Sequence, residues 1–437
     1  MKKVLVISYY WPPSGGSGVQ RWLKFVKYLP QFGWIPYVFT PENPAFPIKD
    51  PSLLNDVPKE AEVIRFPIWE PYETFFKVAG LAGKRKSENP NAMVTVKSES
   101  LFHKISTWIR GNFMIPDPRM FWIHPSVKYL ESYLNKNSIN IIVTTGPPHS
   151  MHRIGYFLKK KNPNLIWIAD FRDPWSEWGL METLRVSKFV KTIHRRLEQQ
   201  VLRTADELIT VTDYYVKRFE LLSDKKVHLI SNGFDEDDFK NIQYKKTEKF
   251  YIRHAGIVNE KSNPIPFMNA VRVLAEENSE FRKSCLVEFV GEVHPVFREF
   301  IAKDEILKEF TKFIPTIPHH QLIELYGETS VLLLIITEHV GAEGYTHGKS
   351  YEYIATGVPI LAVGPPEGDA AKLLRETSSG EIFSSAEPDK IKKALLKLFE
   401  QWKSGEGKKR VVNDTYSRKK LSQQLATLLD SKVDAIN

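Results

Sequence analysis

The segment 348–361 contains the residue types that a phosphate-binding turn needs. An apolar run at 331–336 leads through a glycine-containing loop into Gly348-Lys349-Ser350-Tyr351-Glu352, which predicts strand, loop, helix and strand. The first turn of a helix carries unpaired N–H groups and a partial positive charge, and phosphate oxygens bind there. Lys349 adds a full positive charge, and Glu352 could accept hydrogen bonds from sugar hydroxyls. The segment indicates a site for a nucleoside diphosphate that carries a sugar, with an ordinary α/β crossover and a surface lysine as the alternative.

A histidine stands at the end of another predicted strand. The segment 144–150 reads Thr-Thr-Gly-Pro-Pro-His-Ser, and it places His149 just before a predicted helix. An imidazole at a strand end could orient or deprotonate the hydroxyl of an acceptor. A structural histidine is the alternative interpretation.

Two carboxylates follow the next predicted strand. The segment 170–175 contains Asp170, Arg172 and Asp173. Asp170 or Asp173 could act as acid, base or hydroxyl ligand, and Arg172 could hold a phosphate or pair with a neighbouring carboxylate. An internal ion pair is the alternative. No cluster of histidine ligands accompanies the carboxylates, so the sequence predicts no metal site.

The loop after the first predicted strand is rich in glycine. Its segment 9–21 includes Gly16 and Gly18, which let the backbone approach a ligand closely. Arg21 stands where a dinucleotide fingerprint has its third glycine, and the second strand ends in Thr40 rather than in an acidic residue. A nicotinamide-dependent enzyme is therefore disfavoured.

The elements that must position these residues alternate between strand and helix patterns along the whole chain. Near-continuous apolar strands separated by helices predict parallel sheets that are covered on both faces. The strands are predicted at 3–8, 35–40, 62–66, 139–144, 165–169, 207–211, 227–230, 250–255, 285–290, 331–336, 359–362 and 381–383. A polar linker is predicted at 235–249, between two sets of such strands. The predicted fold class is therefore α/β with two Rossmann-like domains. Ligands of such sheets bind at the carboxyl ends of the strands.

The composition is that of an ordinary globular protein. The 437 residues suffice for two domains, and 42% of them are hydrophobic. The net charge of +9 suits nucleic acid, an anionic membrane surface or phosphorylated small molecules, but no nucleic-acid-binding signature accompanies it. We expect no transmembrane segment, because no apolar run approaches ~18 residues. The single cysteine, Cys285, precludes an internal disulfide and favours a reducing compartment.

With these residues assembled, the chain resembles the GT-B glycosyltransferases, specifically the retaining family four type. The matching segments lie at 13–18, 232–235, 256–261 and 349–359. The segments 145–150 and 170–175 resemble a subgroup that takes part in bacterial surface-polysaccharide assembly. Two details depart from the family pattern. Ile257 stands where the family has an arginine, and Glu343 and Glu352 have eight residues between them rather than seven.

The resemblance implies two Rossmann-like domains that face a central cleft. The acceptor-binding domain is expected at 1–240, the donor-binding domain at 249–412, and a C-terminal helix at 413–437 that packs back on the first domain. Glu352 would hold the donor ribose, Lys349 the diphosphate and His149 the reacting sugar or acceptor. The full set of site residues is His149, Asp170 and Asp173 as catalytic candidates, with Gly16, Gly256, Lys261, Glu343, Lys349 and Glu352 at the donor.

The implied activity is transfer of a sugar, with retention of configuration, from a nucleotide-sugar donor, UDP- or GDP-linked, to a glycan or lipid-linked acceptor. No cofactor is expected, since the nucleotide-sugar is a substrate. No metal ion is expected either, since protein cations would carry the negative charge of the departing diphosphate. Alternatives are a nucleotide-sugar epimerase, a phosphorylase and a catalytically silent binding module. The aromatic and basic insertion at 67–123 could rest on an anionic bilayer or form a packed lid. We therefore expect a cytoplasmic protein that does not bind nucleic acid. If the insertion rests on a bilayer rather than forming a lid, the protein would bind the inner face of the cell membrane peripherally.

Overall fold

A computed structural model of the chain describes residues 2–46, 48–70, 101–177, 181, 184–260, 262, 264–337, 341–405 and 414–433. Most of the predicted insertion, at 71–100, and the candidate ligand Lys261 lie outside the described residues. The chain divides into two compact units. Unit 1 takes the residues up to Ser231 and the segment from Arg418, and unit 2 takes residues 232–417.

Unit 1 is built on a seven-stranded sheet with the order β3-β2-β1-β4-β5-β6-β7, and all pairings between its described strands are parallel. The strands are β1 Lys2–Ile7, β2 Trp34–Pro41, β3 Glu62–Phe66, β4 Ile141–Gly146, β5 Ile166–Phe171, β6 Glu207–Thr210 and β7 Val227–Leu229. The helices are α1 Ser17–Tyr28, α4 Leu101–Phe113, α5 Met120–Asn137, α6 Ser150–Lys161, α8 Lys188–Thr204, α9 Asp213–Ser223 and α19 Arg418–Val433, with 3₁₀ turns η1 Leu29–Phe32 and η2 Pro51–Asp56.

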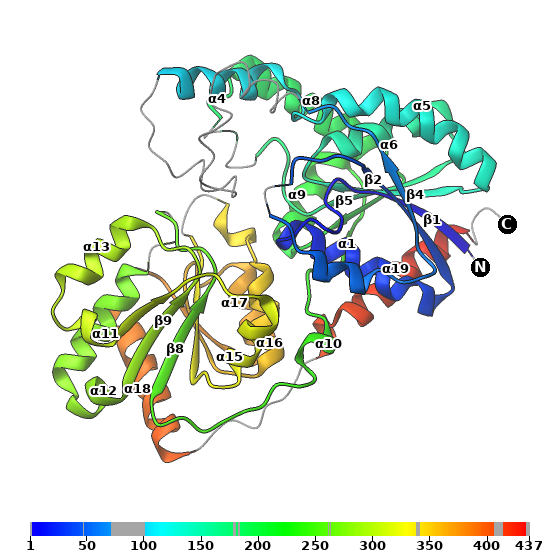
Figure 1. Ribbon diagram of the computed structural model, residues 1–437. Coiled ribbons are helices and arrows are strands. Elements are labelled where there is room, and N and C mark those ends of the chain that lie inside the picture. The colour runs from blue at the N-terminus through cyan, green and yellow to red at the C-terminus, as the bar shows by residue number, and fades with distance from the viewer. Residues whose placement is uncertain are drawn as a thin grey trace. The chain divides into compact units, whose positions relative to one another are not determined.

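The central strands of unit 1 are buried on both faces, which is why they appear in the sequence as continuous apolar runs. Alternate residues of β1 enter two different layers: Leu5 and Ile7 pack with α5, α6, α8 and α9, whereas Val4 and Val6 pack with α1 and α19. Figure 1 shows α5 and α6 on one side of the sheet and α1 and α19 on the other. Helix α19, at the end of the chain, thus completes one face of a sheet that begins at residue 2.

Unit 2 is built on a six-stranded parallel sheet with the order β10-β9-β8-β11-β12-β13. The strands are β8 Phe250–Ala255, β9 Cys285–Val290, β10 Thr311–Ile314, β11 Val331–Ile335, β12 Ile360–Val363 and β13 Gly380–Phe383. The helices are α10 Glu236–Phe239, α11 Ile265–Glu277, α12 Ser279–Ser284, α13 Pro295–Lys303, α14 Leu307–Phe310, α15 His319–Tyr326, α16 Gly348–Thr356, α17 Asp369–Glu376 and α18 Pro388–Ser404, with 3₁₀ turns η3 Ala342–Gly344 and η4 Asp414–Tyr416.

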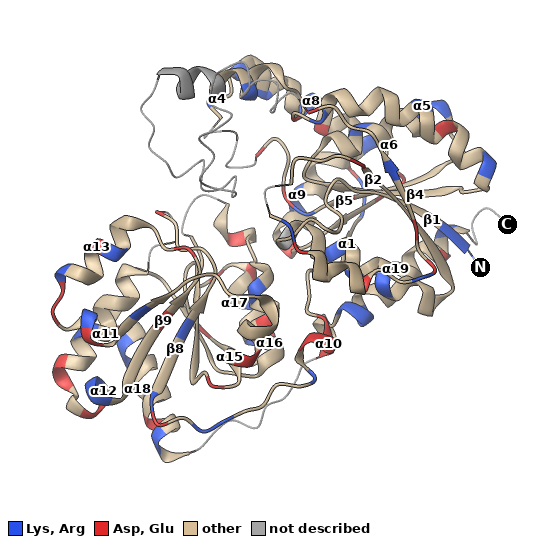
Figure 2. Cartoon of the chain, viewed as in Figure 1, with Lys and Arg blue, Asp and Glu red and all other residues tan. Residues whose placement is uncertain are grey.

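The sheet of unit 2 also separates two layers of apolar side chains. Helices α11 and α18 cover one face, and α15, α16 and α17 cover the other (Figure 1). Lys and Arg lie mainly on the helices of the two units, interspersed with Asp and Glu (Figure 2), as the solvated helix faces of an α/β protein require.

The prediction of two parallel α/β sheets is confirmed, and each of the twelve predicted strand segments overlaps a strand of the structure. Strand β10 was missed. None of its four residues, Thr-Lys-Phe-Ile, is fully buried, because β10 lies at the edge of its sheet. The continuous apolar run that marks a central strand is therefore absent.

Candidate functional site

Each sheet has one place where the strand order reverses, and ligands of open α/β sheets bind there. In unit 1 the reversal lies between β1 and β4, and in unit 2 between β8 and β11. The loop that contains Gly16 follows β1, and the loop that contains His149 follows β4. In unit 2, Gly256 follows β8, and the described residues 336–337 and 341–347 stand between β11 and α16. The topology therefore gathers most sequence-predicted residues at two places, one in each unit.

In unit 2, Lys349 is the second residue of α16, and its ammonium lies against the end of β8. The Lys349 Nζ is 3.4 Å from Nε2 of His254, the last residue but one of β8. Gly256 follows that strand with a φ of 122°, and a Cβ placed on it would lie 2.8 Å from the Lys349 Nζ. The absence of a side chain at Gly256 therefore leaves the room that the ammonium occupies.

The start of α16 brings further polar groups to this place. His347 is the N-cap residue, and its buried Nε2 has no hydrogen-bond partner among the described residues; the same holds for the Ser350 Oγ. Burial, and then the charge of Lys349, lowers the pKa of His347 to about 3, so this imidazole is neutral. The helix ends at Gly357, whose φ of 63° is the left-handed conformation of a helix C-terminus. Unsatisfied buried groups at a helix N-terminus suit an anionic ligand.

The two candidate glutamates occupy different environments. Glu352 is half-buried, one turn along α16 from Lys349, and its Oε1 lies 3.5 Å from Nε2 of His319. Glu343 is an exposed residue of η3. The backbone of η3 packs closely on Gly368, because a Cβ on Gly368 would lie 2.9 Å from the Glu343 carbonyl oxygen. The structure thus places Glu352 on the same helix as the lysine and Glu343 on a loop next to α17.

In unit 1, His149 is only 3% exposed and precedes α6. Its ring stacks in parallel on Trp175, with 4.8 Å between the ring centroids. Burial, followed by the nearby His152, His194 and Arg172, lowers the pKa of His149 well below its usual range, so the ring is neutral. A neutral imidazole keeps one nitrogen that can accept a hydrogen bond from a hydroxyl.

The start of α6 is capped from a distant part of the chain. Asp117 accepts hydrogen bonds from the backbone N–H of Ser150 at 2.8 Å and from the Ser150 Oγ at 2.9 Å. A carboxylate in this position satisfies an otherwise unpaired donor and complements the helix dipole. Asp117 therefore fixes the turn on which His149 stands.

Asp170 is fully buried inside unit 1 and is surrounded by donors. Its carboxylate accepts hydrogen bonds from Arg21 Nη2 at 2.9 Å, Trp22 Nε1 at 2.7 Å and Thr145 Oγ1 at 2.9 Å. Burial acts to raise the pKa of Asp170, but the charge and hydrogen bond of Arg21, the hydrogen bond from Trp22 and the charge of Arg172 outweigh it and hold the pKa below its usual value. Asp170 thus forms an internal ion pair, with Arg21 rather than with Arg172 as its partner, and its catalytic role stays a prediction.

Arg172 joins two candidate loops of unit 1. Its guanidinium donates to the carbonyl oxygens of Gly18 at 2.7 Å and Gly146 at 3.3 Å, and also to that of Pro147. Burial raises the pKa of the neighbouring Asp173, while Arg172 acts in the opposite direction. Arg172 consequently fixes the backbone beside His149, and Asp173 stands next to it as a carboxyl group that burial makes more basic.

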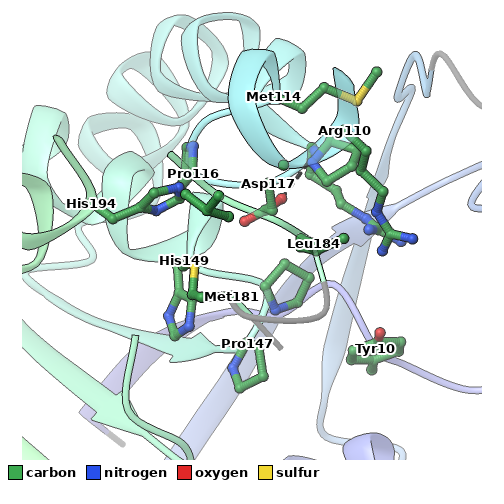
Figure 3. A pocket seen from close by; sticks show the side chains of 15 residues that line it. Tyr10, Arg110, Met114, Pro116, Asp117, Pro147, His149, Met181, Leu184 and His194 are labelled. Atoms are coloured by element: carbon green, nitrogen blue, oxygen red, sulfur yellow. Dashed lines mark hydrogen bonds between the residues drawn. The ribbon is translucent and has the colours of Figure 1, made fainter. Parts of the chain in front are cut away.

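A cavity of about 150 Å³ opens beside these loops. Figure 3 shows His149 and His194 on one side of it and Arg110 and Tyr10 on the other. Apolar side chains supply much of the remaining wall, namely Met114, Pro116, Pro118, Pro147, Pro148, Met181, Leu184 and Val186. Such a lining, apolar with a few polar groups, is typical of a pocket for an organic ligand.

Sequence reasoning missed several residues that take part in these two places: Arg21, Asp117, His194, His254 and His347. Two of them had a sequence signal, since His254 and His347 stand within two residues of Gly256 and Gly348. Arg21 was noted only as a departure from a glycine pattern. Nothing in the sequence marks Asp117 or His194.

The fold matches solved structures over almost the entire chain. Sucrose-phosphate synthase from Thermosynechococcus elongatus aligns with a TM-score of 0.63 and 14% identity, covering 100% of both chains. A glycosyltransferase from Rickettsia africae aligns with a TM-score of 0.62 and 14% identity, covering 98% of this chain and 97% of the other. A candidate UDP-N-acetylglucosamine 2-epimerase from Listeria monocytogenes aligns with a TM-score of 0.56 and 11% identity, covering 100% and 98%.

No protein-family model and no curated protein matches the sequence. At the identities found, the structural likeness establishes the fold alone. It confirms the predicted fold class, two Rossmann-like domains with parallel sheets as in the GT-B glycosyltransferases.

Proposed function

We propose that this protein is a glycosyltransferase that moves a sugar from a nucleoside diphosphate to a glycan or lipid-linked acceptor. The observation that carries the proposal is the ammonium of Lys349 at the N-terminus of α16, beside the point where the strand order of unit 2 reverses. Anions bind at such helix starts, and ligands of α/β sheets bind at such reversals. The fold, shared with a glycosyltransferase and with sucrose-phosphate synthase, supports the same activity.

The chemistry of transfer explains why a lysine is needed. The bond between the anomeric carbon and the diphosphate oxygen breaks, and its electron pair stays on the diphosphate. The anomeric carbon bonds to the oxygen of the acceptor hydroxyl, whose proton passes to the departing diphosphate. Negative charge therefore grows on the departing diphosphate, where Lys349 and the dipole of α16 would stabilise it. With protein cations in this role, we propose that transfer needs no metal ion and that it retains the anomeric configuration, as in family four. Activity that persists in excess chelator would support metal independence, and loss of activity there would refute it.

We assign the acceptor to unit 1. The cavity beside His149 combines apolar walls with polar groups, as an acceptor with both sugar and apolar parts would require. Neutral His149 could accept a hydrogen bond from the attacking hydroxyl and orient it. A lipid-linked acceptor would be consistent with a role in surface-polysaccharide assembly.

The experiment that tests the proposal is a thermal-shift panel with UDP, GDP, ADP and NAD, followed by turnover of the matching nucleotide-sugars. A ligand at 100 times its dissociation constant adds about 2.7 kcal/mol to stability. Stabilisation by UDP or GDP supports the proposal and identifies the base of the donor. Stabilisation by NAD alone would overturn it.

A second candidate function is that of a nucleotide-sugar epimerase or a phosphorylase, and the likeness to the candidate 2-epimerase favours the epimerase among these. An epimerase would convert the donor without an acceptor, whereas a transferase leaves a new glycoside on a second sugar. A protein that binds nucleotide without converting any nucleotide-sugar would instead be a silent binding module. Product analysis with and without acceptor distinguishes the three.

Peripheral binding to the inner face of the cell membrane is part of the proposal. Unit 1 exposes two pairs of aromatic rings in contact, Trp69 with Phe121 and Trp108 with Phe113. Exposed aromatic residues together with the net charge of +9 suit an anionic bilayer surface. In the described parts of the chain no helix is long and apolar enough to cross a bilayer. Co-sedimentation with anionic liposomes at physiological salt tests this, and protein left entirely in the supernatant would refute it.

A further inference from the structure

The ammonium of Lys349 lies against two residues at the end of β8. The Nε2 of His254 is 3.4 Å from it. A Cβ on Gly256 would lie 2.8 Å from the same nitrogen, so the glycine leaves the space that the ammonium occupies. These two residues are 95 and 93 positions from the lysine in sequence, and their contacts restrict a side chain whose long flexible stem would otherwise take many conformations.

The hydrogen bonds of His254 determine what its ring can offer to the lysine. Nδ1 lies 3.0 Å from the carbonyl oxygen of Leu333 on the neighbouring strand β11. A carbonyl oxygen only accepts, so Nδ1 carries the proton and donates it. The other nitrogen, Nε2, then has a lone pair, and the ammonium of Lys349 can donate to it.

His254 is only 1% exposed, and burial followed by the charge of Lys349 lowers its pKa well below the usual range. The ring is therefore neutral and does not compete with the lysine for an anion. Burial also lowers the pKa of Lys349 to about 8, and Glu352 on the same helix acts in the opposite direction. His347 is the remaining titratable group beside the ammonium among the described residues, and it too is neutral.

We propose that His254 and Gly256 are positioning residues that hold the ammonium of Lys349 toward the N-terminus of α16, ready for an anionic diphosphate. The ligand class rests on the proposed function. The positioning itself rests on the contacts of His254 with Leu333 and Lys349 and on the space at Gly256.

The proposal has a consequence for pH. Since the pKa of Lys349 is about 8, the ammonium is present below pH 8 and is lost as the pH rises through that value. Affinity for a diphosphate should therefore decline above pH 8, well before an exposed lysine would lose its proton. A bound diphosphate favours the charged form, so the pKa of Lys349 should be higher in the complex than in the free protein.

The first experiment measures the dissociation constants of UDP, GDP and ADP by calorimetry from pH 6 to 9.5. His254→Leu removes the hydrogen-bond acceptor of the ammonium. We expect this variant to bind the nucleotide that wild type binds about tenfold more weakly at pH 7. The pH at which its affinity falls to half should also differ from that of wild type. His254→Gln keeps a polar group of similar reach and should restore most of the affinity. Cys285→Ala, which alters a buried residue at the start of β9 and so at the opposite end of the sheet, is the control and should change neither value. An unchanged affinity and pH midpoint in His254→Leu would overturn the proposal.

The second experiment needs no nucleotide. In protein labelled with ¹⁵N-histidine, the His254 signals should show a neutral ring with the proton on Nδ1, and the Nε2 shift should titrate near pH 8 as Lys349 loses its proton. Lys349→Met should abolish this titration, and His254→Gln assigns the signals. A proton on Nε2, or a shift that ignores Lys349, would refute the positioning. If wild type binds no nucleotide but shows these shifts, the proposed function fails while the positioning stands.

Discussion

At the scale of the single residue, Lys349 has the clearest chemistry. Among the predicted donor-site residues that the structure describes, only Lys349 combines a positive charge, a position at a helix N-terminus and partial burial. A charge in such a place is worth more than one in water, because the surrounding medium screens it less. Its effect should therefore appear in the rate of the chemical step more than in stability.

We predict that Lys349→Ala lowers the turnover of a nucleotide-sugar by ~100-fold or more, because one preorganised donor to a developing negative charge is worth about 2.7 to 4 kcal/mol. Steady-state kinetics with saturating donor measures the effect. Lys393→Ala, on the exposed face of α18, is the matched control and should leave turnover unchanged. Equal turnover in the two variants would contradict the assignment of Lys349.

Asp170 allows the catalytic and structural interpretations to be separated. Its buried ion pair with Arg21 predicts that Asp170→Ala destabilises unit 1 by about 3–5 kcal/mol, because the variant leaves an uncompensated buried charge. Urea unfolding measures the change. Asp170→Asn, which preserves the shape, is the informative companion: a folded Asp170→Asn protein without turnover would support the catalytic interpretation, and an active one would exclude it.

Buried histidines of unit 1 predict sensitivity to acid. Burial lowers the pKa of His152 to about 3, whereas the unfolded chain binds its proton near pH 6.5. Between these values the unfolded state holds more protons, so the free energy of unfolding should fall as the pH falls from 6.5 toward 3. We expect denaturant unfolding at pH 5 to show lower stability than at pH 7.5. His152→Asn should reduce that difference, although His194, with a pKa of about 4, still contributes.

At the scale of the element, α19 shows how far a segment can lie in sequence from its packing partner. Its residues Leu421, Leu425 and Leu429 are buried in the same layer as Trp22 and Leu23 of α1. Their spacing of four residues is the apolar stripe of one helix face. The helix thus stabilises the sheet that carries the loops around His149.

We predict that Leu425→Ala destabilises unit 1 by about 2–5 kcal/mol, because the side chain is fully buried and its removal leaves a cavity. Urea unfolding followed by circular dichroism gives the value. Gln424→Ala on the exposed face of the same helix should change stability by less than about 0.5 kcal/mol. A loss below ~1 kcal/mol in Leu425→Ala would show that α19 contributes little to unit 1.

At the scale of the whole molecule, the chain has separate apolar layers in each of its two units. Each unit, with the two layers on either side of its sheet, is large enough to support its own cooperative unfolding. A ligand stabilises the unit that binds it. The two proposed binding functions should therefore be separable by thermal analysis of the intact chain.

We predict two transitions in scanning calorimetry of the full chain. UDP or GDP should raise the midpoint of the unit 2 transition, and Leu425→Ala should lower that of the unit 1 transition. For a unit of this size, 1 kcal/mol moves a midpoint by about 2–4 °C. A nucleotide that shifted only the transition sensitive to Leu425→Ala would place the donor in unit 1 and contradict the proposal.

The sequence by itself determined every described strand except β10 and the class of both sheets, because burial leaves an apolar pattern that can be detected locally. Only the tertiary structure decided which residues meet. Arg21 pairs with Asp170 across 149 positions, and His254 contacts Lys349 across 95. Such partners depend on the order and register of the strands. Those are set by contacts between distant segments, and they leave no periodic signal in either segment.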